Sequence, residues 1–456
     1  MTSNLWRIAA TAAVGIAGCA VLVGQVRTSP PQPMADRLPP VGVAKPKPGS
    51  LVDKPPTANP TVPAGFTVKS YAEMQAPRMM VYAPNGDLFV SSPGANSITV
   101  LRDANNDGIF ESREVFAQGE APARRGGGGG APPTPPPATV VNPEINGPIL
   151  GAKAPACVEP PAFANKGPGT LAAPFGMAFH DGYLYVGNTG SIVRYKYTSG
   201  DLKAQGAPEK LMDLPTGGHS TRNIVFNRAG TKMYVAVGSS SNNNAGEDCR
   251  RAAILEFNPD GSGYRVYASG IRNPVGLTLQ PGTDIVWTSI NERDNLGDDL
   301  VPDYATSVKD GGFYGWPYSY IGSNYDPRYV GAFPDLVKRA TVPDVLIPAH
   351  SAALGMAFYT GMQFPERYRN GGFVALHGSW NRSIASGYKV AFFPMVNGKP
   401  GPLEDFLTGF LTKDGANSAP IERWGRPVGV TVARDGGLLI SDDGSNRIWK
   451  ISAGAK

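Results

Sequence analysis

Residues 79–90 read MMVYAPNGDLFV, and this short phrase decides the fold. An apolar run, a turn containing glycine and a second apolar run are typical of two antiparallel strands joined by a short connection. Five further copies follow along the chain: FGMAFHDGYLYV at 175–186, NIVFNRAGTKMYV at 223–235, VGLTLQPGTDIVW at 275–287, a longer copy over 354–376, and VGVTVARDGGLLI at 428–440. Repeated pairs of strands predict an all-β chain folded as a six-bladed β-propeller.

The composition supports a turn-rich domain with a large core. The chain has 456 residues, among them 57 Gly and 44 Pro, and only 17% of its residues are charged. The net charge is +5 and no block of Lys and Arg follows the chain. We therefore expect no nucleic-acid partner.

The N-terminal segment predicts export from the cytoplasm. Arg7 precedes the uncharged stretch 8–26, which indicates a signal peptide or a membrane anchor over 1–26. Ile16–Cys19 also resembles a lipobox, in which case Cys19 carries lipid. All three alternatives place the main domain in the periplasm, with or without a membrane tether.

Composition also divides the remainder of the chain. Residues 27–63 are rich in Pro and predict a linker, and residues 64–454 form the propeller domain. Phe66–Val68 is expected to complete the last blade and so close the ring. Residues 120–172 are rich in Gly and Pro and predict an insertion between the first two blades. Cys157, inside this insertion, either pairs with Cys249 or remains a free thiol.

Polar side chains precede the inner strand of most copies. Equivalent positions of a closed ring meet at one mouth of its channel, so we expect these side chains to share a site. Guanidinium groups and imidazoles gathered there favour an anionic ligand. The residues are Arg78, His219 with Arg222, Arg272 with Asn273, His350 and Arg426, and His377 follows a second strand.

Several common kinds of site are absent from the sequence. The chain has no nucleophile elbow, no H-E-x-x-H, no P-loop and no dinucleotide fingerprint. The sequence motifs that usually bind NAD or ATP, or that usually support zinc chemistry, are therefore absent.

Two acidic segments offer oxygen ligands. Asp103, Asn105 and Asp107 alternate before Gly108, and Glu114 follows six residues later, which is the spacing of a calcium loop. Because apolar strands flank it, we interpret it as a calcium-binding hairpin, with an ordinary polar turn as the alternative. The second segment, 291–299, follows a strand of the fourth copy and points to the same mouth as Arg272.

Five strings in fixed order carry a family resemblance. They are GHSTRN at 218–223, GIRNP at 270–274, NERD at 291–294, GGFYGWP at 311–317 and HGSWNR at 377–382. With them the chain resembles the soluble pyrroloquinoline-quinone (PQQ) dehydrogenases of the glucose/sorbosone dehydrogenase family, nearer to the aldose and sorbosone branch. The resemblance covers 64–454 without the insertion.

The resemblance implies a function for the predicted mouth. The chain would oxidise an aldose- or sorbosone-like sugar hydroxyl or aldehyde hydrate with PQQ and Ca²⁺, and a quinone or cytochrome would accept the electrons. His219 would be the general base, and Arg272 would polarise the quinone. The implied cofactor-binding residues are Arg272, Asn273, Arg293, His377, Arg382 and Arg426, and the implied metal loop contains Asp294 and Asn295.

This chain departs from the glucose enzymes at two places. It has Asp294 and Asn295 where those enzymes have Gly-Pro, and Trp424 where they carry a second Arg. Two other functions therefore stay open. One is a non-catalytic, calcium-stabilised propeller that binds carbohydrate or an envelope partner. The other is a calcium-dependent lactonase, which would need several carboxylates on the axis.

Overall fold

The structure, a computed structural model, describes residues 32–105, 107–120 and 166–454. Strands dominate these residues, and the one α-helix among them, α1 (Pro334–Lys338), has five residues. Four short 3₁₀ turns lie at Pro93–Ala95, Pro327–Tyr329, Glu366–Tyr368 and Ala416–Ser418. The all-β class is confirmed. In the described part of the chain, no helix has the length and apolar character needed to cross a membrane.

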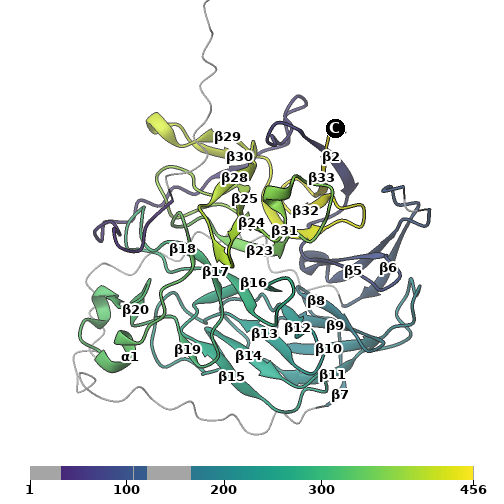
Figure 1. Ribbon diagram of the computed structural model, residues 1–456, viewed down its shortest axis with the longest axis horizontal. Coiled ribbons are helices and arrows are strands. Elements are labelled where there is room, and N and C mark those ends of the chain that lie inside the picture. The colour runs from purple at the N-terminus through teal and green to yellow at the C-terminus, as the bar shows by residue number, and fades with distance from the viewer. Residues whose placement is uncertain (1–31, 106, 121–165, 455–456) are drawn as a thin grey trace, which may run out of the picture.

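Six sheets of four or five strands stand around one centre in the described residues (Figure 1). The first contains β3 (Met80–Tyr82), β4 (Leu88–Ser92), β5 (Ser97–Arg102) and β6 (Ser112–Gln118). The second contains β7 (Gly167–Pro168), β8 (Met177–His180), β9 (Tyr183–Asn188), β10 (Ser191–Lys196) and β11 (Glu209–Asp213). The third contains β12 (Ile224–Phe226), β13 (Met233–Val237), β14 (Ala253–Phe257), β15 (Arg265–Ser269) and β19 (Gly312–Phe313).

The remaining three large sheets complete the circle. The fourth contains β16 (Asn273–Leu279), β17 (Val286–Asn291), β18 (Asp303–Ser307) and β22 (Val345–Ile347). The fifth contains β23 (Ala353–Phe358), β24 (Gly372–Leu376), β25 (Lys389–Phe393) and β28 (Glu404–Leu407). The sixth contains β31 (Pro427–Val432), β32 (Leu438–Asp442), β33 (Arg447–Ala453) and β2 (Phe66–Glu73). Every copy of the sequence phrase thus forms the two innermost strands of a sheet, and the inner one of each pair is called its first strand below.

The sixth sheet joins the two ends of the domain. β2, from the start of the domain, pairs antiparallel with the C-terminal strand β33, so that Val68 lies opposite Ile451. The expectation that Phe66–Val68 completes the last sheet is confirmed.

The first strands of the six sheets contact one another in a closed circle. β3 contacts β8, and the series continues through β12, β16, β23 and β31 back to β3. Polar side chains tie neighbouring sheets together at this level. The Ser91 hydroxyl donates to the Phe175 carbonyl at 2.6 Å, and the Ser441 hydroxyl donates to that of Arg78.

The glycine that recurs in the inner strands explains this close approach. A Cβ on Gly355 would lie 2.4 Å from the carbonyl oxygen of Val428, and one on Gly429 would lie 2.4 Å from that of Arg78. Both distances are shorter than van der Waals contact. The phrase therefore keeps glycine where one inner strand passes the next.

Each gap between neighbouring sheets holds its own apolar cluster. Between the fifth and sixth sheets, for example, Phe373, Phe406, Trp424 and Trp449 pack together. A further apolar cluster unites Phe175, which precedes β8, with Val275, Leu354 and Val428 from three inner strands. We call this cluster the apolar plug.

Smaller elements cover the outside of the ring. They comprise β1 (Ser50–Leu51) with β29 (Leu411–Asp414) and β30 (Ile421–Arg423), the pair β20 (Ser319–Tyr320) and β21 (Asn324–Tyr325), and the pair β26 (Met395–Val396) and β27 (Lys399–Pro400).

The segment expected to be a linker is packed against the domain over its described part. β1 pairs parallel with β30, and the Gly42 amide donates to the Leu296 carbonyl at 2.9 Å. Leu38 packs against the core cluster that contains Leu296. The Pro-rich segment therefore runs along the loop that follows β17.

Other predictions fall outside the described residues. These are the signal or anchor at 1–26 and most of the 120–172 insertion, including Cys157. Cys249 is disulfide-bonded.

Candidate active site

The polar residues at the mouth form two groups above the apolar plug. The first surrounds His219 and Arg272, and the second surrounds His377 and Arg426. Segments after the second strands reach the same end as segments before the first strands, because paired antiparallel strands begin and end together. His377 follows β24 in this way, and its backbone amide donates to the Ala352 carbonyl at 3.0 Å.

His219 lies in the first group with one ring nitrogen fixed. Its Nδ1 is 2.9 Å from the carbonyl oxygen of Ser239. A carbonyl can only accept, so Nδ1 carries the proton and Nε2 carries the lone pair. Burial, with help from the positive charge of Arg272, lowers the pKa of His219 to about 3. The imidazole is therefore neutral at ordinary pH, and the lone pair on Nε2 has no hydrogen-bond partner among the described residues.

Arg222 supports the loop that presents His219. Its guanidinium is fully buried and donates to the carbonyl of His219 at 2.9 Å and to that of Pro215 at 2.7 Å. Burial, followed by the nearby Arg251, lowers the pKa of Arg222 to about 10. Arg222 thus fixes the loop and does not face a ligand.

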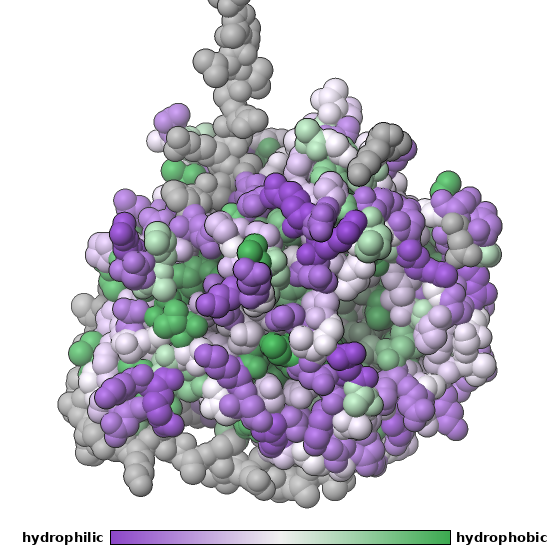
Figure 2. Space-filling view, viewed as in Figure 1, coloured by the Kyte–Doolittle hydropathy of each residue, from purple (hydrophilic) through white to green (hydrophobic). Residues whose placement is uncertain are grey.

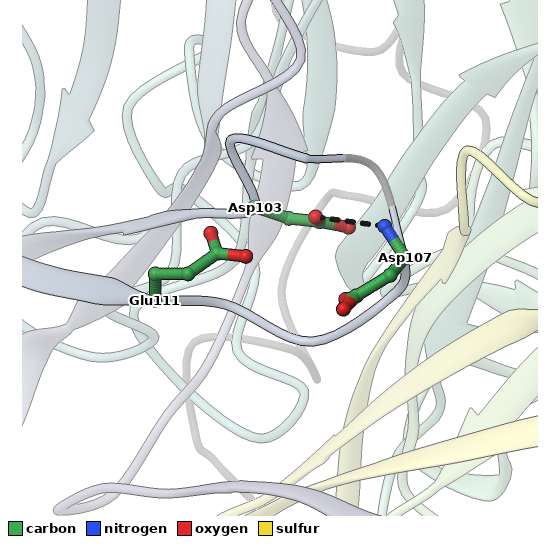
Figure 3. Close-up of side chains that lie close together, drawn as sticks. All are labelled: Asp103, Asp107 and Glu111. Atoms are coloured by element: carbon green, nitrogen blue, oxygen red, sulfur yellow. Dashed lines mark hydrogen bonds between the residues drawn. The ribbon is translucent and has the colours of Figure 1, made fainter.

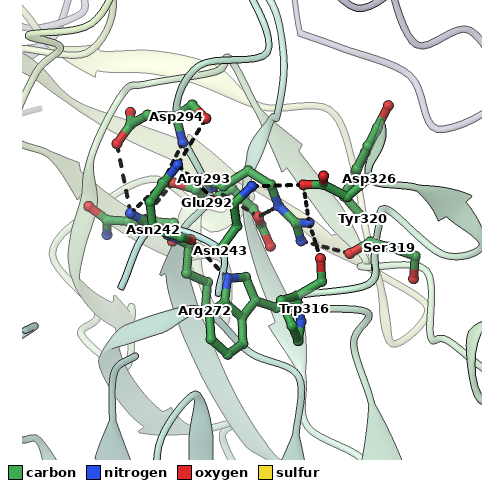
Figure 4. A network of polar contacts seen from close by, with 12 residues as sticks. Asn242, Asn243, Arg272, Glu292, Arg293, Asp294, Trp316, Ser319, Tyr320 and Asp326 are labelled. Atoms are coloured by element: carbon green, nitrogen blue, oxygen red, sulfur yellow. Dashed lines mark hydrogen bonds and ion pairs between the residues drawn. The ribbon is translucent and has the colours of Figure 1, made fainter. Parts of the chain in front are cut away.

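Arg272 is held from two sides beside His219. It donates to the main-chain oxygen of Asn242 at 2.9 Å and to the side-chain oxygen of the same residue at 3.0 Å. It also donates to the Glu292 carbonyl at 2.7 Å and lies 3.7 Å from the Asp294 carboxylate. Contacts with Asn242 and with the loop after β17 therefore hold the Arg272 guanidinium in place (Figure 4).

Asn242 is a site residue that the sequence analysis missed. Its amide also bonds both backbone groups of Asp294, at 2.9 and 3.1 Å, so it joins the Arg272 strand to the loop after β17. It lies in the polar run 239–244, and nothing in that run distinguishes one Asn from the next.

Asn273 leaves an acceptor unused. Its side-chain oxygen is buried and has no hydrogen-bond partner among the described residues. A Cβ on Gly238 would lie 2.3 Å from this oxygen and 2.7 Å from the Cβ of His219. Asn273 and His219 therefore both lie next to Gly238. A bound group that donates a hydrogen bond there could pair with the Asn273 side-chain oxygen.

His350 occupies the equivalent position of another sheet but has acidic surroundings. Its Nδ1 lies 3.2 Å from the Asp294 carboxylate, and its Nε2 lies 2.9 Å from the Gly297 carbonyl. Both partners accept hydrogen bonds, which favours the doubly protonated ring. Burial opposes that charge, but the Asp294 carboxylate outweighs it, and the pKa of His350 is raised.

Asp303 braces the two loops that carry these groups. It accepts the amides of Glu292 at 2.8 Å and Ala352 at 2.7 Å. Burial raises the pKa of Asp303 to about 7 in spite of those bonds. The backbone around Asp294 and His350 is therefore linked through one buried carboxyl group.

The two predicted metal ligands after β17 differ in their surroundings. The Asp294 carboxylate contacts His350 and Arg272, and its pKa is lowered because those partners outweigh its burial. Asn295 is exposed with φ 76°, and its side chain makes no hydrogen bond within the described residues. Within the described residues, neither side chain belongs to a group of three acidic or histidine side chains that could hold a metal ion.

Arg293 does not reach the mouth, which corrects the prediction that it binds cofactor. Its side chain is fully buried and pairs with Glu292 at 3.0 Å and with Asp326 at 3.1 Å. It also donates to the carbonyls of Pro317 and Ser319, so all its nitrogens are engaged (Figure 4). Arg293 anchors the loop from below.

The second group centres on a carboxylate that sequence reasoning also missed. Asp443 accepts from His377 at 2.8 Å and from Arg78 at 2.6 Å. Arg426 donates to the His377 carbonyl at 3.2 Å. Burial and Arg426 lower the pKa of His377 to about 3. The pKa of Asp443 is lowered despite its burial, first by the contact with His377 and then by the charges of Arg78 and Arg426. A search of the positions after each second strand would have found Asp443, because it follows β32.

Arg382 faces a loop instead of the open mouth. It donates to the Asp299 carboxylate at 2.7 Å and to the Asp298 carbonyl. Its Nε is buried and has no partner among the described residues. The segment 377–382 thus spans from the second group to the end of the loop that contains Asp294.

The predicted calcium hairpin lies at the opposite end of its sheet. Side-chain oxygens of Asp103, Asp107 and Glu111 lie within 4.8 Å of one another (Figure 3). Asn105 accepts the Asp107 amide at 2.8 Å beside them. Glu114 does not belong to this cluster. It lies in β6 opposite Val100 of β5, and its carboxylate is 3.8 Å from the Lys203 ammonium group. Glu111 replaces it, since the loop turns back before β6.

Comparison with known proteins agrees with this arrangement. The family model for glucose/sorbosone dehydrogenase matches residues 186–379, which contain His219, Arg272 and His350. The chain belongs to the glucose/sorbosone dehydrogenase family. A TrAA12-like family model matches residues 336–454.

Three similar proteins illustrate the family. The aldose sugar dehydrogenase YliI of Escherichia coli is 26% identical over 200 residues, which are 40% of this chain and 52% of that protein. The holo PQQ domain of a Coprinopsis cinerea pyranose dehydrogenase has a TM-score of 0.64 and 20% identity, covering 88% of this chain and 98% of that one. A calcium structure of a Trichoderma reesei AA12 enzyme has a TM-score of 0.65 and 16% identity, covering 88% and 99%. These structural likenesses support the fold.

Proposed function

We propose that this chain is a PQQ-dependent dehydrogenase that oxidises a hydroxyl or aldehyde hydrate of a sugar. The observation that carries the proposal is His219, whose Nδ1 donates to the Ser239 carbonyl at 2.9 Å. This leaves Nε2 as a base beside the fixed charge of Arg272. A base next to a cation suits removal of a hydroxyl proton while negative charge develops nearby.

The residues at the mouth fit a planar, polyanionic quinone. Arg272 and Arg426 supply cations, and the unused Asn273 oxygen together with Nε2 of His219 supplies acceptors. His377 would hold a ligand only through a neutral ring, because its pKa is low. When bound, the quinone would supply the acceptor for the hydride and its two electrons.

The chain's own residues would divide the remaining work. His219 Nε2 takes the hydroxyl proton from the sugar, and the Ser239 carbonyl stabilises the resulting imidazolium through Nδ1–H. Arg272 stays in place because Asn242 and the Glu292 carbonyl hold it, so no reorganisation is needed when charge develops.

We further propose two calcium sites. One would use main-chain oxygens of the 293–295 loop and would make a bound quinone more electrophilic. The other would use Asp103, Asp107 and Glu111 to stabilise the far end of the first sheet. The calcium structure of the Trichoderma reesei relative supports the choice of metal.

Architecture and location complete the proposal. The six sheets would be the blades of a closed six-bladed propeller, because their inner strands contact one another in a circle. We infer a periplasmic location from the uncharged segment 8–26 and from the disulfide at Cys249. Electrons would pass to a membrane quinone or a cytochrome.

Cofactor uptake tests the proposal directly. Purified full-length protein is titrated with PQQ in the presence of Ca²⁺, and dye reduction is then measured with a panel of aldoses. We expect a saturable change in quinone absorbance and sugar-dependent dye reduction. Failure of PQQ to bind would favour the non-catalytic carbohydrate-binding alternative. Binding without turnover on any sugar or aldehyde would reject the proposed substrate class.

A further inference from the structure

Ser239 joins the loop that carries His219 to the strand that carries Arg272. Its backbone amide donates to the Arg272 carbonyl at 2.8 Å, and its carbonyl accepts the His219 amide at 3.0 Å. The same carbonyl oxygen lies 2.9 Å from Nδ1 of the His219 ring. Ser239 is fully buried. One residue therefore sets the position of the His219 loop relative to the Arg272 backbone.

The hydroxyl of Ser239 holds the His219 ring from a second direction. Its Oγ lies 3.1 Å from Nδ1 and donates its own proton to the Ser241 carbonyl at 2.7 Å. Because the hydroxyl proton is used in that bond, an oxygen lone pair is left to accept from Nδ1–H. A flipped imidazole would lose both Ser239 acceptors. The two contacts therefore keep Nδ1 on this side and the Nε2 lone pair on the other.

Glu247 fixes the turn 239–242 that follows. Its carboxylate accepts the Ser240 amide at 2.7 Å, the Ser241 amide at 2.7 Å and the Ser241 hydroxyl at 2.6 Å. Hydrogen bonds to a charged carboxylate are stronger than neutral ones, so three donors on one group hold this backbone firmly. Glu247 thus determines where the carbonyl that receives the Ser239 hydroxyl lies.

The same turn contacts both halves of the first polar group. It ends at Asn242, whose main-chain and side-chain oxygens both accept from Arg272 (Figure 4). A Cβ on Gly218, directly before His219, would lie 2.3 Å from the Cα of Ser240. The loop of the base therefore packs directly on the turn that holds the guanidinium.

We propose that Ser239 and Glu247 are positioning residues for the sugar oxidation, an inference that rests on the proposed function. Ser239 orients the His219 ring, and Glu247 fixes the turn that ties this ring to Arg272. The sugar hydroxyl proton would then pass to a lone pair held in one direction. A small misplacement of a reacting group can cost a large factor in rate, so loosening this turn should slow the chemical step.

The first test removes the Ser239 hydroxyl. The charged groups that act on the His219 imidazole are Arg272, Arg222 and Asp294, and Ser239→Ala leaves all of them in place. We expect kcat of the PQQ- and Ca²⁺-loaded protein to fall about tenfold, and KM for the aldose to stay within about twofold. Steady-state dye reduction measures both quantities.

The second test loosens the turn from its other side. Glu247→Gln keeps an acceptor on only one of the two oxygens, so it should also lower kcat about tenfold, and Glu247→Ala should lower it further. Ser239→Ala and Glu247→Gln act through the same hydroxyl contact. Their combined effect on kcat should therefore be smaller than the product of the two single effects.

Controls come from the exposed surface, and hydrophilic residues are spread over the face drawn in Figure 2. Ser199→Ala matches the serine variant, because Ser199 is exposed in the segment that follows β10. Glu366→Gln matches the glutamate variant, because Glu366 is exposed in the 3₁₀ turn between β23 and β24. Both should leave kcat unchanged.

A readout without catalysis separates positioning from a general loss of structure. In NMR spectra of the apoprotein, the Nδ1–H proton of His219 should exchange slowly with water in the unaltered chain and in both controls. Ser239→Ala and Glu247→Gln should both speed this exchange. A fall in kcat with an unchanged Nδ1–H signal, or one explained by weaker PQQ binding or lower stability, would contradict the inference.

Failure of this inference can be told from failure of the function on which it rests. If the unaltered protein neither takes up PQQ nor reduces dye, the proposed function is wrong, whatever the exchange measurement shows. If the unaltered protein turns over and both variants keep its kcat, the proposed function stands and the positioning role is rejected.

Discussion

His219 and His350 lie at equivalent places of two sheets, yet their surroundings shift the pKa values of the two imidazoles in opposite directions. His219 faces a carbonyl and lies near Arg272, and its pKa is lowered to about 3. His350 faces the Asp294 carboxylate, and its pKa is raised. Both rings are largely buried, so burial alone does not decide the charge. The neighbouring charged groups therefore decide the direction in which each imidazole pKa moves.

The largest effect should follow from removing the basic imidazole. His219→Ala should lower kcat by about 10²- to 10⁴-fold, because no other described group has a free basic nitrogen beside Arg272. Stopped-flow measurement of cofactor reduction checks this, and PQQ affinity should change far less. His180→Ala is the matched control, since His180 stacks on Phe226 at the far end of β8. Retained turnover in His219→Ala would remove it as the base.

A second prediction concerns the buried cation beneath the His350 loop. Arg293→Met leaves the carboxylates of Glu292 and Asp326 buried without their partner. We expect the free energy of unfolding to fall by about 3–5 kcal/mol, measured by urea denaturation. Arg228→Met, at an exposed position, should change it by less than about 0.5 kcal/mol. If Arg293→Met instead lowers PQQ affinity and leaves the free energy of unfolding unchanged, Arg293 binds the cofactor.

Asp294→Asn tests whether the neighbouring carboxylate causes the difference between His219 and His350. The variant removes the carboxylate that charges His350 and lies 3.7 Å from Arg272. The pKa of His350 should fall, and kcat should fall by up to about 10²-fold as Arg272 shifts. NMR titration of the imidazoles reads the first effect, and the chain has only four histidines. Asp435→Asn, which alters a pair with Lys450 at the far end, should leave both quantities unchanged.

The most gradual expected effect is the response of stability to pH. His219 and His377 have a folded pKa of about 3, below the usual 6.5, so the unfolded chain binds more protons at acid pH. Each imidazole should therefore contribute a loss of at most about 1.4 kcal/mol per pH unit as the pH falls from about 6.5 to about 3. Thermal unfolding of His377→Gln between pH 7 and 4.5 should show a shallower slope. An unchanged slope would contradict the buried, neutral ring.

The positions of His219 and His350 could be predicted from the sequence, but their contacts could not. The strand pairs at 79–90 and at the other five copies were predictable, because an apolar run and a glycine turn act locally. Placing His219, Arg272 and His350 at one end followed from those copies. The Asp294 contact with His350, the Asn242 contacts with Arg272 and the burial of Arg293 did not, because each joins segments from different sheets or loops.

The two metal hypotheses show the same division. Asp103 and Asp107 lie within one loop, so their spacing alone predicted that they would meet. The choice of Glu111 over Glu114 depended on where the chain re-enters β6. At 294–295, the sequence could not show that His350, from the next sheet, would contact the Asp294 carboxylate.

The sequence by itself determined the strands, the repeated glycines that let inner strands pass, and the end of the sheets at which His219, His350 and His377 lie. These features depend on interactions between near neighbours in the chain. The tertiary structure alone decided the direction of the pKa shifts of His219, His350 and His377, the burial of Arg293 and the exposure of Trp380. Those properties depend on electrostatic and packing contacts between residues far apart in sequence, and such contacts form only when the ring is closed.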